Sequence, residues 1–167
     1  PALTALKSSA PFLKKVSGVR NQAAITLEIN GNAVRHEIGE LQWTDYGISG
    51  VAIFQLSRFA ITALEENKKV SLSFDFMPEL SSEEKGNLFL SLAQNNKKKS
   101  MLSFLKGLFP AKLCPIILRE AKVEEGQTTG RMKKQDWENL VKAVAHFSLR
   151  INGYVSYEKA QVTRGGV

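Results

Sequence analysis

The stretch Gly47-Ile48-Ser49-Gly50-Val51 places a serine between two glycines, directly before an apolar run, and is the first candidate for chemistry in this chain. The nucleophile turn of α/β-hydrolases needs G-x-S-x-G, whereas here the second glycine comes one position early. No plausible general base neighbours Ser49 in the sequence. The pattern argues against a serine nucleophile, and we expect no catalytic residue in this chain.

Two other roles remain open for Ser49. Serine is a preferred helix N-cap, and the following residues Ile53, Phe54, Leu56 and Ala60 can form an apolar helix face. A helix N-terminus can also hold an anion, since its first N–H groups are free. We favour the capping role and keep ligand contact as the alternative.

Metal and thiol chemistry find little support. Cys114 is the single cysteine, so an internal disulfide is impossible, and its apolar neighbours predict a core position. The two histidines, His36 and His146, are far apart in the sequence and lack partners at metal spacing. No G-x-G-x-x-G follows a strand, so no dinucleotide phosphate turn is expected.

The net charge of +7 raises the possibility of a nucleic-acid partner. Residues 79–146 hold 12 Lys and Arg against 8 Asp and Glu, and the rest of the chain holds 11 against 8, so the excess is spread evenly. Only Lys97, Lys98 and Lys99 form a run. We interpret it as a solvated turn between helices, with phosphate contact, aided by Lys106 and Lys112, as the alternative.

The first third of the chain is typical of β structure. Ala23–Ile29 is rich in β-formers, Asn30-Gly31 is a strong type I′ hairpin signal, and 33–43 returns as a second strand. Val70–Phe76 alternates apolar and polar residues, which predicts a half-buried strand.

The period then changes to that of short helices. Ser81 and Glu84 form a capping box, with Leu88, Phe89 and Leu92 as the face of the first helix. Three more helices are predicted from Met101 to Leu108, near Pro115, and around Trp137. A polar loop at 123–132 precedes the last of them, and strands at 148–152 and 160–163 follow it. We therefore predict an α+β fold: a discontinuous β-barrel-like subdomain at 1–78 and 147–167, interrupted by a small helical bundle at 79–146.

Three segments together resemble the BaiN-like, or aminoacetone-oxidase-like, family of NAD(P)/FAD-dependent bacterial flavoproteins. They are PALTALK at the start, LQWTDYGISGVAIFQLSR in the middle and KAQVTRGGV at the end. The middle motif of that family reads roughly F-T-H-x-G-[LI]-S-G-P. Asp45 stands where the family has His, and Val51 stands where it has Pro. No role of the family histidine can therefore be carried over to Asp45.

The resemblance implies that the chain is the insertion domain of a FAD-dependent oxidoreductase, inactive alone and holding no cofactor alone. FAD would bind to the FAD-binding domain of the same polypeptide, with Gly165, Gly166 and Val167 at the junction. The insertion would cover the cavity of a small-molecule substrate, lined by Tyr46, Gly47, Ser49 and Gly50. The chain has no signal peptide and no apolar run of membrane-spanning length, so we expect a cytoplasmic protein without membrane contact. A basic nucleic-acid-binding module is the alternative function.

Overall fold

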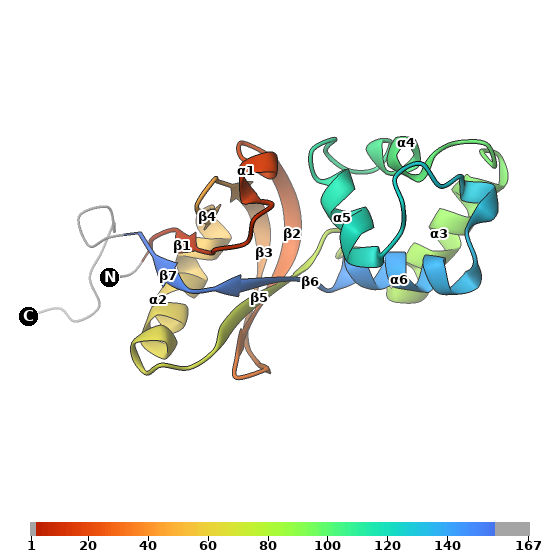
Figure 1. Ribbon diagram of the computed structural model, residues 1–167. Helices are drawn as coiled ribbons and strands as arrows, with labels where there is room; N and C mark the ends of the chain where they lie inside the picture. The colour runs from red at the N-terminus through yellow and green to blue at the C-terminus, as the bar shows by residue number, and fades with distance from the viewer. Residues whose placement is uncertain (1–2, 156–167) are drawn as a thin grey trace, which may run out of the picture. The chain divides into compact units, whose positions relative to one another are not determined.

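The computed structural model describes residues 3–155 and has the predicted α+β class (Figure 1). The chain divides into two compact units. The first unit contains the described residues up to Phe74 and those from Ser148 onward, and the second runs from Asp75 to Phe147. The first unit is therefore built from two separate parts of the chain.

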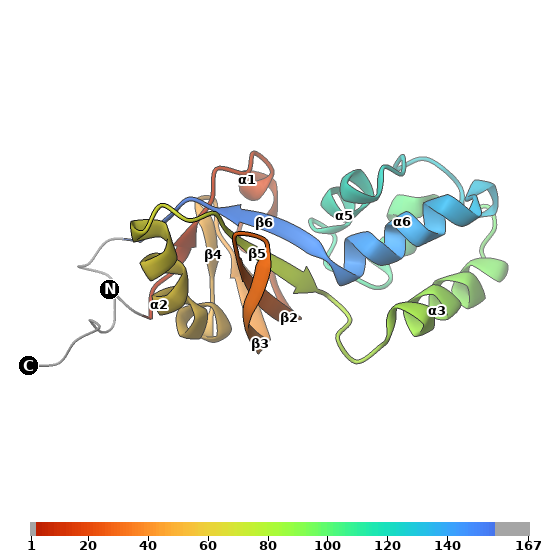
Figure 2. The same ribbon diagram turned by 90° about the horizontal axis from the view of Figure 1, so that it is seen from below.

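The first unit is organised around a seven-stranded sheet in the order β6-β5-β2-β3-β4-β1-β7. The edges of the described sheet are β6 and β7, so the barrel-like unit expected from the family resemblance is an open sheet here. The strands are β1 Leu6–Lys7, β2 Arg20–Ile29, β3 Asn32–Trp43, β4 Gly47–Ser49, β5 Val70–Asp75, β6 Phe147–Ile151 and β7 Gly153–Tyr154. In Figure 2, β5 and β6 run next to one another, as the strand order requires.

The β2–β3 hairpin forms at the predicted turn. Asn30 and Gly31 have φ of 52° and 82°, the positive values that a type I′ turn requires at both central residues. The antiparallel register runs from Ile29 opposite Asn32 to Arg20 opposite Gln42, with a bulge between Leu27 and Glu28. The predicted hairpin is confirmed.

The sheet is covered by the long helix α2 (Val51–Glu65), while the short helix α1 (Leu13–Val16) precedes β2 (Figure 1). The buried residues of α2 include Ile53, Leu56 and Ala60, as the apolar spacing predicts. The capping prediction is wrong. The N-cap is Gly50 and no side chain caps the helix, because Ser49 belongs to β4 and pairs with Gln42 of β3.

An aromatic cluster occupies the core of this unit. The buried Trp43 ring lies 6.1 Å from the ring of Phe12 and 5.5 Å from that of Phe74, measured between centroids. Its indole N–H donates to the side-chain oxygen of Asn21 at 2.9 Å, so the polar atom of this buried residue is satisfied.

The second unit is helical. It comprises α3 Ser82–Gln94, α4 Met101–Lys106, α5 Cys114–Ala121, the 3₁₀ helix η1 Thr129–Arg131 and α6 Lys134–Ala145. Phe104 joins the core by edge contacts with Phe89 and Trp137, at centroid distances of 6.4 and 5.8 Å. Pro115 lies in the first turn of α5, where its missing N–H costs no helix bond, as predicted.

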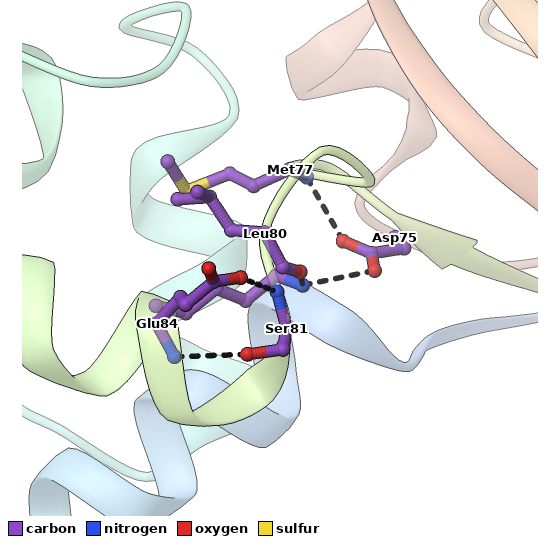
Figure 3. A network of polar contacts seen from close by, with 6 residues as sticks. Asp75, Met77, Leu80, Ser81 and Glu84 are labelled. Carbon is purple, nitrogen blue, oxygen red and sulfur yellow. Dashed lines mark hydrogen bonds and ion pairs between the residues drawn. The ribbon is translucent and has the colours of Figure 1, made fainter.

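The start of α3 is held by a local polar network, drawn in Figure 3. The predicted capping box is present: the Ser81 hydroxyl accepts from the Glu84 N–H, and the Glu84 carboxylate accepts from the Ser81 N–H. Beside it, the buried Lys85 ammonium donates to Asp75 at 3.0 Å and to the Leu80 carbonyl at 2.6 Å. Burial of this lysine is tolerated because both bonds are charge-assisted.

Three details differ from the sequence-based expectation. The buried face of α3 is Lys85, Phe89 and Ala93, while Leu92 is 38% exposed. The polar loop before α6 contains the helix η1. The strand predicted at 160–163 lies outside the described residues.

Candidate functional site

The family-motif segment folds as a tight turn between β3 and α2. The Thr44 N–H donates to the Gly47 carbonyl at 3.0 Å and closes the turn. β4 then runs between β1 and β3, with Ile48 opposite both Leu6 and Trp43. The backbone of the turn is therefore held by strands that come from two other parts of the chain.

The two glycines of the turn are required by these neighbours. A Cβ on Gly47 would lie 2.0 Å from the Leu6 carbonyl oxygen, and one on Gly50 would lie 2.5 Å from that of Glu40. Gly50 also has a φ of +119°, which residues with a side chain rarely adopt. The space beside both glycines is thus filled by the protein's own backbone. The turn does not fit the pyrophosphate of FAD, which needs glycines facing open space.

The side chains of the turn present a more open face. Tyr46 is 43% exposed and Asp45 is exposed, whereas Ser49 is half-buried. The Tyr46 carbonyl accepts from the Ser8 N–H at 3.0 Å, so the backbone is fixed while the phenol faces outward. Of the four residues predicted to line a cavity, Tyr46 presents its side chain most fully to a partner.

Thr44 is a residue of this site that the sequence analysis missed. Its hydroxyl is buried and has no hydrogen-bond partner among residues 3–155. Buried polar groups are hydrogen-bonded in the great majority of cases, so the unpaired Thr44 hydroxyl is an exception to a general rule of protein structure. The only signal in the sequence is that Thr44 matches the threonine of the family motif.

The two ends of the described fold lie next to one another. Leu6 and Lys7 of β1 pair with Tyr154 and Gly153 of β7, and the Val155 N–H donates to the Ala5 carbonyl at 3.0 Å. The expected junction residues Gly165, Gly166 and Val167 lie outside the described residues.

Among residues 3–155, two cavities that are large enough for a small ligand lie away from this turn. One, about 740 Å³, lies between α3 and α6 and is lined by Leu90, Trp137 and Val141 among others. The other, about 460 Å³, lies between α2 and the β2–β3 hairpin, beside Val34, Phe59 and Lys68. Both are bordered by apolar and charged side chains and can accept an apolar group with a polar end.

The cysteine and histidine side chains that could do chemistry have structural surroundings. Burial raises the pKa of the Cys114 thiol to about 11, and its Sγ lies 3.4 Å from the Pro110 carbonyl. A thiol in this state is protonated at neutral pH and is a poor nucleophile. His36 is exposed on β3 and contacts the Thr26 hydroxyl at 3.3 Å. Within residues 3–155, no three His, Cys, Asp or Glu side chains cluster as metal ligands, and no helix could cross a membrane.

Comparison with known proteins relates the whole fold to one family. The family model described as "HI0933-like protein barrel and H2TH domain" matches residues 1–162. The chain is 32% identical over 167 residues to a 3-dehydro-bile acid delta(4,6)-reductase of Clostridium scindens, covering all of this chain and 41% of that relative. It is 27% identical over 156 residues to a ribosomal RNA dihydrouridine synthase of Haemophilus influenzae, covering 93% of this chain and 35% of that relative. The chain thus spans less than half the length of these curated relatives.

Proposed function

Because the chain belongs to the family of HI0933-like protein barrel and H2TH domains, we propose that it is the insertion domain of a larger FAD-dependent oxidoreductase. In that enzyme another part of the polypeptide binds FAD, and the β unit described above helps to enclose the substrate next to the flavin. The isolated chain supplies shape and contacts rather than a cofactor site.

The observation that carries this proposal is the pairing of β1 with β7. An inserted domain must leave its host and return to it at nearly the same place, because the host chain continues on both sides. Leu6 opposite Tyr154 meets this requirement within the described fold. The relatives support the same reading, since this chain matches only 41% and 35% of their lengths.

The turn at 44–47 is the segment that we assign to the substrate cavity. It combines an exposed phenol at Tyr46, an exposed carboxylate at Asp45 and an orphan hydroxyl at Thr44. Closing an active site excludes water from the flavin and strengthens polar contacts to the substrate. Gly47 and Gly50 serve this role indirectly, by fixing the turn on β1 and β3.

The test uses the full-length enzyme with Tyr46→Ala, Thr44→Val and, to restore the family residue, Asp45→His. We expect each change to alter kcat or KM by about tenfold or more, since misplacing a substrate contact commonly costs that much. The flavin absorption spectrum should respond in at least one variant.

Val51→Ala is the matched control, because Val51 is 71% exposed and lies just beyond the turn. Unchanged kinetic constants and an unchanged flavin spectrum in all three turn variants would exclude this segment from the cavity.

RNA binding is a second candidate function. It is favoured by the relative from Haemophilus influenzae, which is named a ribosomal RNA dihydrouridine synthase, and by the net charge of +7. On this view the enzyme's substrate is a base within structured RNA, and the domain helps to hold the RNA. Binding of this chain to a fluorescein-labelled RNA hairpin, followed by anisotropy, tests the candidate directly.

A further inference from the structure

Two segments of the helical unit that are distant in sequence are bound together by their backbones. The Gly130 N–H donates to the Lys97 carbonyl and the Thr129 N–H donates to the Lys99 carbonyl, each at 3.0 Å. The Met101 N–H donates to the Gln127 carbonyl at 2.8 Å, and the buried Thr129 hydroxyl donates to the Asn96 carbonyl. Residues 95–102 and 127–134 therefore form one continuous surface.

This backbone pairing brings together two groups of positively charged residues that are far apart in the sequence. Each segment contributes three cations and no acidic residue. We call them together the basic surface, made of Lys97, Lys98, Lys99, Arg131, Lys133 and Lys134, all of them exposed. The spacing of about thirty residues between the two groups conceals their proximity.

Few carboxylates neutralise the basic surface. Among the described residues, the basic surface contains one ion pair, in which the Lys134 ammonium lies 3.9 Å from the Glu138 carboxylate. Asp136 is engaged by the Lys133 N–H and by Gln127, and Glu124 and Glu125 lie just before the second segment. Holding like charges together destabilises the free protein, and a bound polyanion would offset that cost.

We propose that the basic surface docks the phosphate backbone of structured RNA. This inference rests on the second candidate function given above and names the face that performs it. The two segments contain no aromatic residue, so they lack the stacking platforms that grip unpaired bases. Contacts from lysine and arginine to phosphates position the nucleic acid and carry no base sequence information.

Gly130 keeps the two cationic segments close. A Cβ at this position would lie 2.9 Å from the Lys97 carbonyl oxygen, closer than such atoms approach. Glycine therefore allows the second segment to lie directly against the lysine run, and the buried Thr129 side chain fixes its orientation.

The test measures RNA affinity of this chain across a range of salt concentrations. Lys97→Gln, Lys98→Gln and Lys99→Gln are combined in one variant. The control variant combines Lys7→Gln, Lys14→Gln and Lys15→Gln, which removes the same charge from exposed positions of the other unit. The probe is a fluorescein-labelled RNA hairpin, titrated at about 50 to 200 mM salt.

We expect the first variant to bind the RNA roughly tenfold more weakly. The negative slope of log affinity against log salt should become shallower by about 2 to 3, which is about one unit for each lost phosphate contact. The control variant should change that slope by less than about 1. A further variant with Arg131→Gln and Lys133→Gln should weaken binding in the same way, because both segments form the surface. Circular dichroism confirms that each variant is folded.

Three outcomes are decisive. Failure of the unmodified chain to bind the hairpin would remove both the second candidate function and this surface. Equal losses in the lysine-run variant and the control would show that only net charge matters and would overturn the surface alone. Loss confined to the basic surface supports the proposal.

Discussion

At the scale of single residues, Thr44 is half-buried, but its hydroxyl oxygen is buried and unpaired. Its hydroxyl has no partner among residues 3–155, whereas the buried hydroxyl of Thr129 donates to the Asn96 carbonyl. The two threonines differ in whether a partner is present, and the same substitution should therefore have opposite effects at the two positions.

We predict that Thr44→Val stabilises the isolated chain by about 1 kcal/mol, because it removes an unsatisfied buried polar group at nearly constant volume. Thr129→Val should destabilise it by about 1 kcal/mol, since the Asn96 carbonyl then loses its donor. Urea unfolding monitored by tryptophan fluorescence measures both. Equal destabilisation by the two changes would mean that the Thr44 hydroxyl is satisfied within the chain.

At the scale of secondary-structure elements, the start of α3 depends on its capping box. The pKa of Glu84 lies below its ordinary value of 4.5, chiefly because the carboxylate accepts the Ser81 backbone N–H and also bonds the Ser81 side chain. A carboxyl whose pKa is lowered by folding stabilises the folded state above its unfolded pKa. That contribution is lost as the pH falls through the folded value.

Glu84→Gln tests this pH dependence, since glutamine can still accept the Ser81 N–H but does not titrate. The difference in unfolding free energy between the original chain and this variant should be constant well above pH 4.5. It should shrink or reverse as the pH falls below that value. If the difference in unfolding free energy stays constant throughout the acid range, the ionised Glu84 carboxylate does not stabilise the start of α3.

Ser81→Ala serves as the companion variant. It removes the hydroxyl that accepts the Glu84 N–H and should cost about 1 kcal/mol at neutral pH. Helical circular dichroism and urea midpoints give both quantities from the same samples.

At the scale of the whole molecule, the helical unit is inserted between two neighbouring strands of the sheet. The chain leaves the β unit after β5 and returns through β6, and these strands are adjacent in the strand order. We propose on this basis that the β unit is able to fold without the helical unit.

Deletion of residues 76–146, with an Asn-Gly turn joining β5 to β6, should leave a β unit that unfolds cooperatively, with lower stability than the full chain. Far-ultraviolet circular dichroism during thermal unfolding provides the measurement. The control deletes α2 instead, which removes the buried side chains of Ile53 and Leu56, uncovers the sheet beneath them and should abolish folding. A broad, non-cooperative transition in the first deletion would contradict the independence of the β unit.

The features predicted correctly from the sequence are governed by neighbouring residues. Positive φ at Asn30 and Gly31 makes the hairpin, the reciprocal bonds of Ser81 and Glu84 begin α3, and Pro115 takes the first turn of α5. The family resemblance likewise rested on contiguous motifs, and the match over residues 1–162 confirms it. Such features need only a few adjacent side chains and backbone groups, so a sequence determines them directly.

Tertiary structure decided what depends on residues far apart in the chain. Ser49 became a strand residue because Gln42 pairs with it, and Gly47 is required by the carbonyl of Leu6. Lys97 meets Gly130, and Leu6 meets Tyr154, through backbone bonds between distant segments. Periodicity and local preference carry no information about which distant carbonyl will lie beside a given residue. The arrangement of the site residues and of the basic surface therefore could not be predicted from the sequence and was given by the tertiary structure.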